Sequence, residues 1–137
     1  MNNLEIKRYE DKYSDEVIKL LNEKFTIEGE IQLEDNENSF SIIALIDNKV
    51  VGHVRVDKLK NIGKNCYYYL INYVCVADNY QNRNIATEML TYLFDYAKKD
   101  CVSYLELTSK ATREAANHLY LKNGFTIKET NVFVKNI

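Results

Sequence analysis

The pattern of apolar and polar residues at the start of the chain predicts a strand followed by a helix. In residues 4–9, "LEIKRY", apolar and charged positions alternate, which is typical of a strand. Ser14 precedes two acidic residues as an N-cap should, and apolar residues then recur at helical spacing as far as Phe25. Residues 26–39 are acidic and only weakly periodic, so a short helix, a loop and a mobile lid are all open there.

The next stretch predicts three strands joined by two turns. Residues 40–59 form two apolar runs that meet at Asp47 and Asn48, and these residue types tolerate the left-handed backbone of a tight hairpin. A second turn at 61–65 leads into residues 66–76, "CYYYLINYVCV". This run is apolar at successive positions, which indicates a central strand covered on both faces.

The second half of the chain predicts alternating helices and strands. Apolar residues at steps of one, three and four indicate a helix over 83–99, and a strand is expected over 101–107. A shorter helix includes residues 115–120 and stops at Asn123–Gly124, where glycine can take the left-handed C-terminal position. Residues 125–137 are predicted to close the chain as one or two strands.

This order of elements predicts an α+β fold. We expect a three-layer α/β arrangement in which helices flank a mixed, mostly antiparallel central sheet, and a single domain over residues 1–137. The apolar share of 46% and the charged share of 28% are those of a folded globular protein.

Charge and composition exclude several classes of function. A formal net charge of -2 without clustered Lys and Arg argues against binding to nucleic acid. No apolar run approaches the roughly 18 residues of a membrane span, and the N-terminal residues lack the apolar core of a signal peptide, so a cytoplasmic protein is expected. The 3 cysteines include no C-x-x-C pair, so neither a disulfide framework nor a metal site is predicted.

The junction between the strand at 66–76 and the next helix is a candidate phosphate site. A helix N-terminus carries unpaired backbone N–H groups and the positive end of the helix dipole. In residues 78–86, "DNYQNRNIA", no bulky apolar side chain covers Asn82 to Asn84, and Arg83 adds a charged donor. The alternative is an ordinary surface turn with helix capping, because neither the P-loop nor the dinucleotide motif is present.

Two motifs resemble those of the GCN5-related N-acetyltransferases. That family carries [QR]-x-x-G-x-[GA] after a strand, which stands here as Gln81-Asn82-Arg83-Asn84-Ile85-Ala86. It also carries A-x-x-x-Y-x-x-x-G-F on a later helix, which is matched here by Ala116, Tyr120, Gly124 and Phe125. The two motifs stand in the family's order, and the predicted elements agree with the family over most of the chain.

The resemblance implies that the chain transfers an acetyl group from acetyl-CoA to a primary amine, most typically of a small molecule, in a ternary complex. The acetyl-CoA would be a co-substrate bound at the junction and along the strand before it. The residues implied to bind it are Val74 and Val76 through their backbone, Gln81, Asn82, Arg83, Asn84, Ile85, Ala86, Thr87 and Tyr120. Asn117 is a further candidate, because its three-residue spacing from Tyr120 places it on the same face of the helix.

The reaction requires a group that accepts the proton of the amine. An amine with a pKa near 10.4 is mostly protonated at pH 7, and removal of its proton there costs about 4.6 kcal/mol. Many relatives use a Glu at a position where this chain has Asn72, which can only orient a water. Other candidates are a Glu within 28–37, Glu106 and His53, and the sequence leaves the choice open.

The family also implies groups that stabilise the transition state. A backbone N–H near Val74 would donate to the oxyanion. Tyr120 would donate a hydrogen bond to the leaving sulfur. Asn84 replaces the first glycine of the motif, and Asn is among the side chains that best tolerate positive φ.

The sequence leaves the acceptor, the function and the oligomeric state open. The acidic segment 28–37 would attract a cationic acceptor such as an aminoglycoside or a polyamine, although a charge run is usually only a solvated surface. A catalytically silent acyl-CoA-binding regulatory domain is an alternative function, since Asn72 and Asn84 depart from the family pattern. A third alternative is an unrelated α+β interaction domain. A homodimer is also open, because no interface is evident in the sequence.

Overall fold

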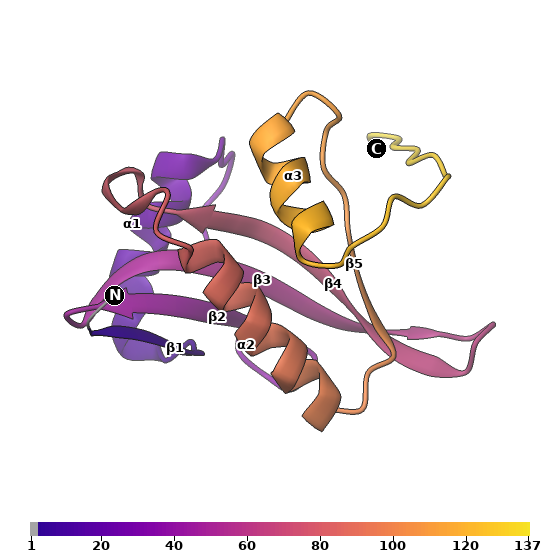
Figure 1. Cartoon of the computed structure of the whole chain (residues 1–137), viewed down its shortest axis with the longest axis horizontal. Coiled ribbons are helices and arrows are strands. Elements are labelled where there is room, and N and C mark those ends of the chain that lie inside the picture. The colour runs from indigo at the N-terminus through magenta and orange to yellow at the C-terminus, as the bar shows by residue number, and fades with distance from the viewer. Residues whose placement is uncertain (1–2) are drawn as a thin grey trace.

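A five-stranded sheet forms the centre of the computed structural model, which describes residues 3–137 (Figure 1). Three α-helices accompany the sheet within these residues. In chain order the elements are β1 (Leu4–Arg8), α1 (Ser14–Lys24), β2 (Ser39–Ile46), β3 (Lys49–Asn61), β4 (Cys66–Val76), α2 (Ile85–Lys99), β5 (Tyr104–Leu107) and α3 (Glu114–Lys122).

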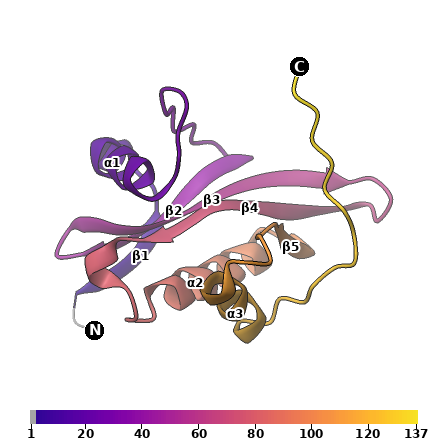
Figure 2. The same cartoon turned by 90° about the horizontal axis from the view of Figure 1, so that it is seen from above.

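The strands lie in the sheet in the order in which they occur in the sequence, β1-β2-β3-β4-β5. The first three pairings are antiparallel, and only β4 and β5 are parallel. Figure 2 shows α1 on one face of the sheet and α2 and α3 on the other. The predicted α+β fold, a mixed and mostly antiparallel sheet flanked by helices, is confirmed.

The hairpin between β2 and β3 forms where the sequence predicts it. Asp47 and Asn48 have φ values of 50° and 64°, which is the left-handed pair that a two-residue hairpin turn requires.

The backbone of β3 packs closely against α2 at Gly52. A Cβ on Gly52 would lie 2.9 Å from the Cε of Met89 and 3.1 Å from the Cβ of Ala44, so only glycine fits there without displacement.

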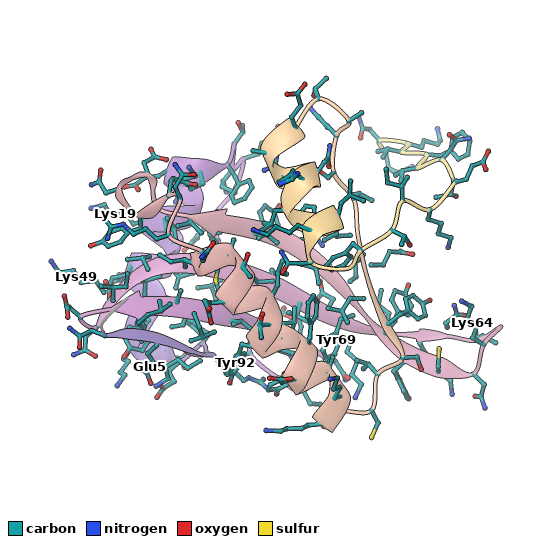
Figure 3. All side chains as sticks on the ribbon, in the orientation of Figure 1. Glu5, Lys19, Lys49, Lys64, Tyr69 and Tyr92 are labelled. Carbon is teal, nitrogen blue, oxygen red and sulfur yellow. The ribbon has the colours of Figure 1, made fainter. Side chains whose placement is uncertain are left out.

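Two hydrophobic clusters hold the helices to the sheet. Ile85, Met89 and Leu93 of α2 are buried against the sheet. Tyr69 of β4, beside α2 in Figure 3, joins this cluster and donates its hydroxyl hydrogen to Asp100 (2.5 Å). On the opposite face, α1 buries an apolar stripe against β2 and the end of β4, formed by Val17, Leu20 and Leu21.

Several predicted boundaries differ from the structure. Ser14 is the first residue of α1 and not its N-cap, because a short 3₁₀ turn at Asp11–Tyr13 precedes it. Residues 101–103 form the connection after α2, which ends at Lys99, and are not part of the next strand. Cys101 takes a φ of 58°, and the Val102 N–H donates to the Ala97 carbonyl (3.1 Å).

The prediction of one or two strands in residues 125–137 is wrong. This segment has no regular secondary structure and runs away from the sheet (Figure 2). A strand is stabilised by a neighbour that accepts and donates its backbone hydrogen bonds, and the local apolar pattern does not supply one. Its large apolar side chains are therefore exposed, namely Ile127, Val132, Phe133, Val134 and Ile137.

The acidic segment between α1 and β2 is a loop. Its C-terminal part is fixed by two arginines. Arg8 donates to the Asp35 carboxylate (2.9 Å) and to the Asn36 carbonyl (2.7 Å), and Arg55 donates to the Glu34 carbonyl (2.8 Å). No helix within residues 3–137 combines the length and the hydropathy needed to cross a bilayer.

Candidate active site

Strand β4 has an open edge along its C-terminal part. Its parallel pairing with β5 covers only Tyr68 to Ile71. β4 continues to Val76, whereas β5 ends at the residue paired with Ile71, Leu107. Beyond Ile71, β4 therefore has no partner strand on this side, and its backbone groups there are available to a ligand.

The direction of the backbone groups along this edge follows from two hydrogen bonds. The Ala77 N–H donates to the Val51 carbonyl of β3 (2.8 Å), so Ala77 faces β3. The Val76 carbonyl instead accepts from the side chain of Gln81 (2.6 Å), so Val76 faces the open edge. Because backbone groups alternate between the two edges of a strand, the N–H of Val74 also points to the open edge.

A bulge next to this edge is held by a buried histidine. The β3–β4 register shifts between His53 and Arg55, and opposite this shift Tyr73 takes a φ of 52°. The Nδ1 of His53 lies 2.8 Å from the Tyr73 carbonyl oxygen, and its Nε2 lies 2.9 Å from the Ser41 hydroxyl. A carbonyl only accepts, so Nδ1 carries the proton and Nε2 accepts from Ser41. The bulge is thus tied to β2 through neutral His53.

His53 is unsuited to act as the base for the amine. Its side chain is 0% exposed, and burial lowers its pKa to about 4. The Ser41 hydroxyl that it binds also accepts from the Arg55 guanidinium (3.1 Å). Both ring nitrogens therefore serve the internal network, and a substrate has no path to either.

The loop before α2 leaves the helix N-terminus open, as the phosphate hypothesis requires. Asn82 and Asn84 each have a φ of 62°, so the tolerance of Asn for the left-handed region is used twice. No side chain caps the helix at Asn84, and residues 81–84 are exposed. Ile85 is buried in the core, so only its backbone can meet a ligand. Arg83 lies over the Tyr80 ring (5.1 Å) at the edge of the loop.

A cleft of about 240 Å³ separates the open edge of β4 from α3, and we call it the narrow cleft. It brings together residues that are far apart in the sequence. The lining residues are Lys24 and Phe25 at the end of α1, Val74, Cys75, Val76, Gln81 and Ala86 around β4 and α2, and Arg113, Ala115, Ala116, Leu119 and Tyr120 on or beside α3.

Tyr120 lines the narrow cleft from α3. Its side chain is 8% exposed and packs edge-on against Phe125 (ring centroids 5.7 Å apart). Burial raises the pKa of Tyr120 above its usual value, against the opposing effect of the nearby Arg113 charge. The phenol therefore stays protonated at neutral pH, and it is a hydrogen-bond donor.

Other predicted site residues lie outside the lining of the narrow cleft. Asn72 is exposed on β4, opposite Arg55 in the register. Thr87 is half-buried on α2, near the amide of Asn123 (3.5 Å). The amide of Asn117 donates to the carbonyls of residues 110 and 111 (2.9 and 3.3 Å).

A second hollow of about 580 Å³ adjoins the narrow cleft, and we call it the wide cavity. None of its lining residues was predicted from the sequence as part of a site; they are Lys24, Phe25, Thr108, Ser109, Lys110, Arg113 and Val132. Lys24, Phe25 and Arg113 are shared with the narrow cleft. The sequence did contain a signal for residues 108–110, because they follow the end of a strand and such residues often lie at a binding site. No acid from the segment 28–37 is among these lining residues.

Comparisons with known proteins agree with this geometry. The model of the Acetyltransferase (GNAT) family matches residues 3–125. The chain therefore belongs to the GNAT acetyltransferase family. No curated protein sequence matches it.

Solved structures share the fold at low sequence identity. A ribosomal-protein-alanine N-acetyltransferase from Brucella melitensis biovar Abortus 2308 superposes with a TM-score of 0.85 at 17% identity, over 98% of this chain and 100% of that one. An aminoglycoside acetyltransferase from an uncultured soil metagenomic sample, in complex with trehalose, gives 0.81 at 19% identity over 99% and 97%. The glucosamine-6-phosphate N-acetyltransferase of Arabidopsis thaliana gives 0.78 at 15% identity over 96% and 97%.

Family membership decides the broad function. The protein is an acetyl-CoA-dependent acetyltransferase, as the two motifs predict. The alternative of an unrelated interaction domain is wrong, because the family model spans most of the chain.

Proposed function

We propose that this acetyltransferase acetylates a primary amine of a small molecule by direct attack of the amine within a ternary complex. The observation that carries the proposal is the junction of the two hollows at Lys24, Phe25 and Arg113. The narrow cleft suits the thioester end of acetyl-CoA, and the wide cavity suits the acceptor. Its volume of about 580 Å³ falls in the usual range for small-molecule sites.

The residues around the narrow cleft fit acetyl-CoA. The open first turn of α2 offers backbone N–H groups to the pyrophosphate, with Asn82 and Asn84 shaping the loop. The open edge of β4 at Val74 and Val76 offers backbone groups to the amides of the pantetheine arm. When bound, acetyl-CoA supplies the activated acyl group.

Two donors are aimed at the reacting atoms in this proposal. The Val74 N–H stabilises negative charge on the thioester oxygen, and the protonated Tyr120 phenol donates to the sulfur. The proton of the amine passes to water, for which exposed Asn72, two residues before Val74, is the proposed anchor.

Direct attack is favoured over an acyl-enzyme because the thiol in the narrow cleft is inactive. Cys75 is 7% exposed, and burial raises its pKa to about 12, with a smaller opposing effect of Lys24. A thiol is a poor nucleophile unless it is ionised. Cys75 therefore packs against α1 and does not carry the acetyl group.

The test is an initial-rate study with a panel of small amines, in which thiol release from acetyl-CoA is followed while both substrates are varied. Intersecting double-reciprocal lines are expected, and the Cys75→Ala variant should show the same pattern. Parallel lines would indicate a covalent intermediate and overturn direct attack. Failure of every small amine, with a peptide amine accepted, would overturn the small-molecule acceptor.

A further inference from the structure

The lining of the wide cavity is rich in cations and free of carboxylates. Three of its seven lining residues, Lys24, Lys110 and Arg113, are basic, and none is acidic. This composition contrasts with the net charge of the chain, which is -2. Positive charge is therefore concentrated at the wide cavity, although the chain as a whole carries a net negative charge.

Two of these three cations are available to a ligand. Lys24 forms an ion pair with Asp78 (2.6 Å). Lys110 and Arg113 take part in none of the ion pairs found within residues 3–137. Both lie on the short segment between β5 and α3, so their side chains can reach one group together.

The backbone beneath Lys110 is fixed, which makes this segment a defined surface. The amide of Asn117, one helical turn into α3, donates to the carbonyls of Lys110 and Ala111. The Arg113 N–H also donates to the Lys110 carbonyl (3.0 Å). Asn117 thus serves as a positioning residue for the backbone that carries Lys110.

A buried hydroxyl in the same lining has no partner. The Oγ of Ser109 is buried and makes no hydrogen bond within the described chain. A buried polar atom without a partner costs about 1–3 kcal/mol, so such atoms are usually paired in the working complex. An oxygen of a ligand would accept its hydrogen.

We propose that the acceptor amine carries an anionic group, a carboxylate or a phosphate, which binds to Lys110 and Arg113 with Ser109 as an additional donor. This inference rests on the proposed function, because it assigns the acceptor to the wide cavity. Guanidinium and ammonium donors beside a hydroxyl are the groups that bind such oxyanions. The expectation of a polycationic acceptor, which came from the acidic segment 28–37, is replaced.

The junction of the two hollows orients the acceptor. Arg113 lines both hollows. When the anionic group of the acceptor binds at Lys110, the amine end of the acceptor therefore extends towards Tyr120 in the narrow cleft.

Matched pairs of amines test the proposal. Glucosamine-6-phosphate is compared with glucosamine, and 4-aminobutanoate with 4-aminobutanamide, while spermidine and kanamycin represent polycations. The anionic member of at least one pair should have a kcat/KM about tenfold higher or more than its neutral partner. Comparison of the phosphate pair with the carboxylate pair shows whether the bound anionic group is a phosphate or a carboxylate. Equal or higher kcat/KM for neutral or polycationic amines would overturn the inference and leave the proposed function intact.

A variant separates the acceptor site from the coenzyme site. Lys110→Gln should raise KM for the anionic acceptor about tenfold, and leave KM for its neutral partner and Kd for acetyl-CoA unchanged, because Lys110 lines only the wide cavity. Lys122→Gln, at the other end of α3, removes the same charge outside both hollows and should change nothing. A weaker acetyl-CoA affinity in Lys110→Gln would assign this cation to the coenzyme and overturn the inference. If no amine of either kind is acetylated, the proposed function fails and the inference fails with it.

Discussion

Lowering the pH from 7 to 5 is expected to remove about 2 kcal/mol from the free energy of unfolding through His53 alone. Burial lowers the pKa of His53 from 6.5 to about 4, with a smaller contribution from the nearby Arg55 charge. Between these two values the unfolded chain binds one proton more than the folded protein. Stability is therefore fully present above pH 6.5 and is lost as the pH falls towards 4, by about 3 kcal/mol across the whole window.

The structure explains why protonation is unfavourable at this position. Nδ1 already donates to the Tyr73 carbonyl, and Nε2 accepts from Ser41. A second proton on Nε2 would face the Ser41 hydroxyl, which already accepts from the Arg55 guanidinium. The added charge would be buried and adjacent to another cation.

The assay is urea unfolding, followed by circular dichroism, of the wild type and the His53→Gln variant at pH 7 and pH 5. Glutamine does not titrate, and its amide can both donate and accept a hydrogen bond. Carboxylates titrate in both proteins, so the difference between their pH dependences isolates the histidine. The wild type should lose about 2 kcal/mol more than the variant. Equal losses would show that His53 is not held neutral and buried, and the account of the bulge would be wrong.

Two further predictions concern the narrow cleft. Tyr120→Phe should lower kcat about tenfold or more, because the donor to the leaving sulfur is lost, while calorimetric Kd for acetyl-CoA stays the same; an unchanged kcat would remove Tyr120 from the mechanism. Asn84→Gly should leave Kd unchanged or lower it, since glycine adopts the observed φ of 62° and brings no Cβ near the pyrophosphate. A clear rise in Kd would refute this interpretation of the loop.

Local patterns predicted most of the elements but not every pairing. The Asp47–Asn48 hairpin and the start of α2 near Asn84 depend on backbone preferences of a few adjacent residues, and both were predicted. Whether residues 125–137 pair with a sheet edge depends on a distant neighbour, and this prediction was wrong. The short strand β5 was predicted too long, because residues 101–103 form the connection that follows α2.

The candidate site shows the same limit. The motif predicted Tyr120 as a site residue, and Tyr120 does line the narrow cleft. The cations at Lys110 and Arg113 belong to no motif, and their meeting depends on how the segment after β5 folds back to α3. A three-residue spacing placed Asn117 on the face of Tyr120, yet its amide is held by loop carbonyls.

The short pairing between β4 and β5 also has a consequence for how the molecule opens. β3 and β4 are joined over nine residue pairs, whereas β4 and β5 are joined over four. Strands β2, β3 and β4 are joined by hairpins, whereas the parallel pairing of β5 with β4 requires α2 to cross the sheet between them. The parallel β4–β5 pairing is thus expected to form late and to open most easily, without disruption of the antiparallel sheet.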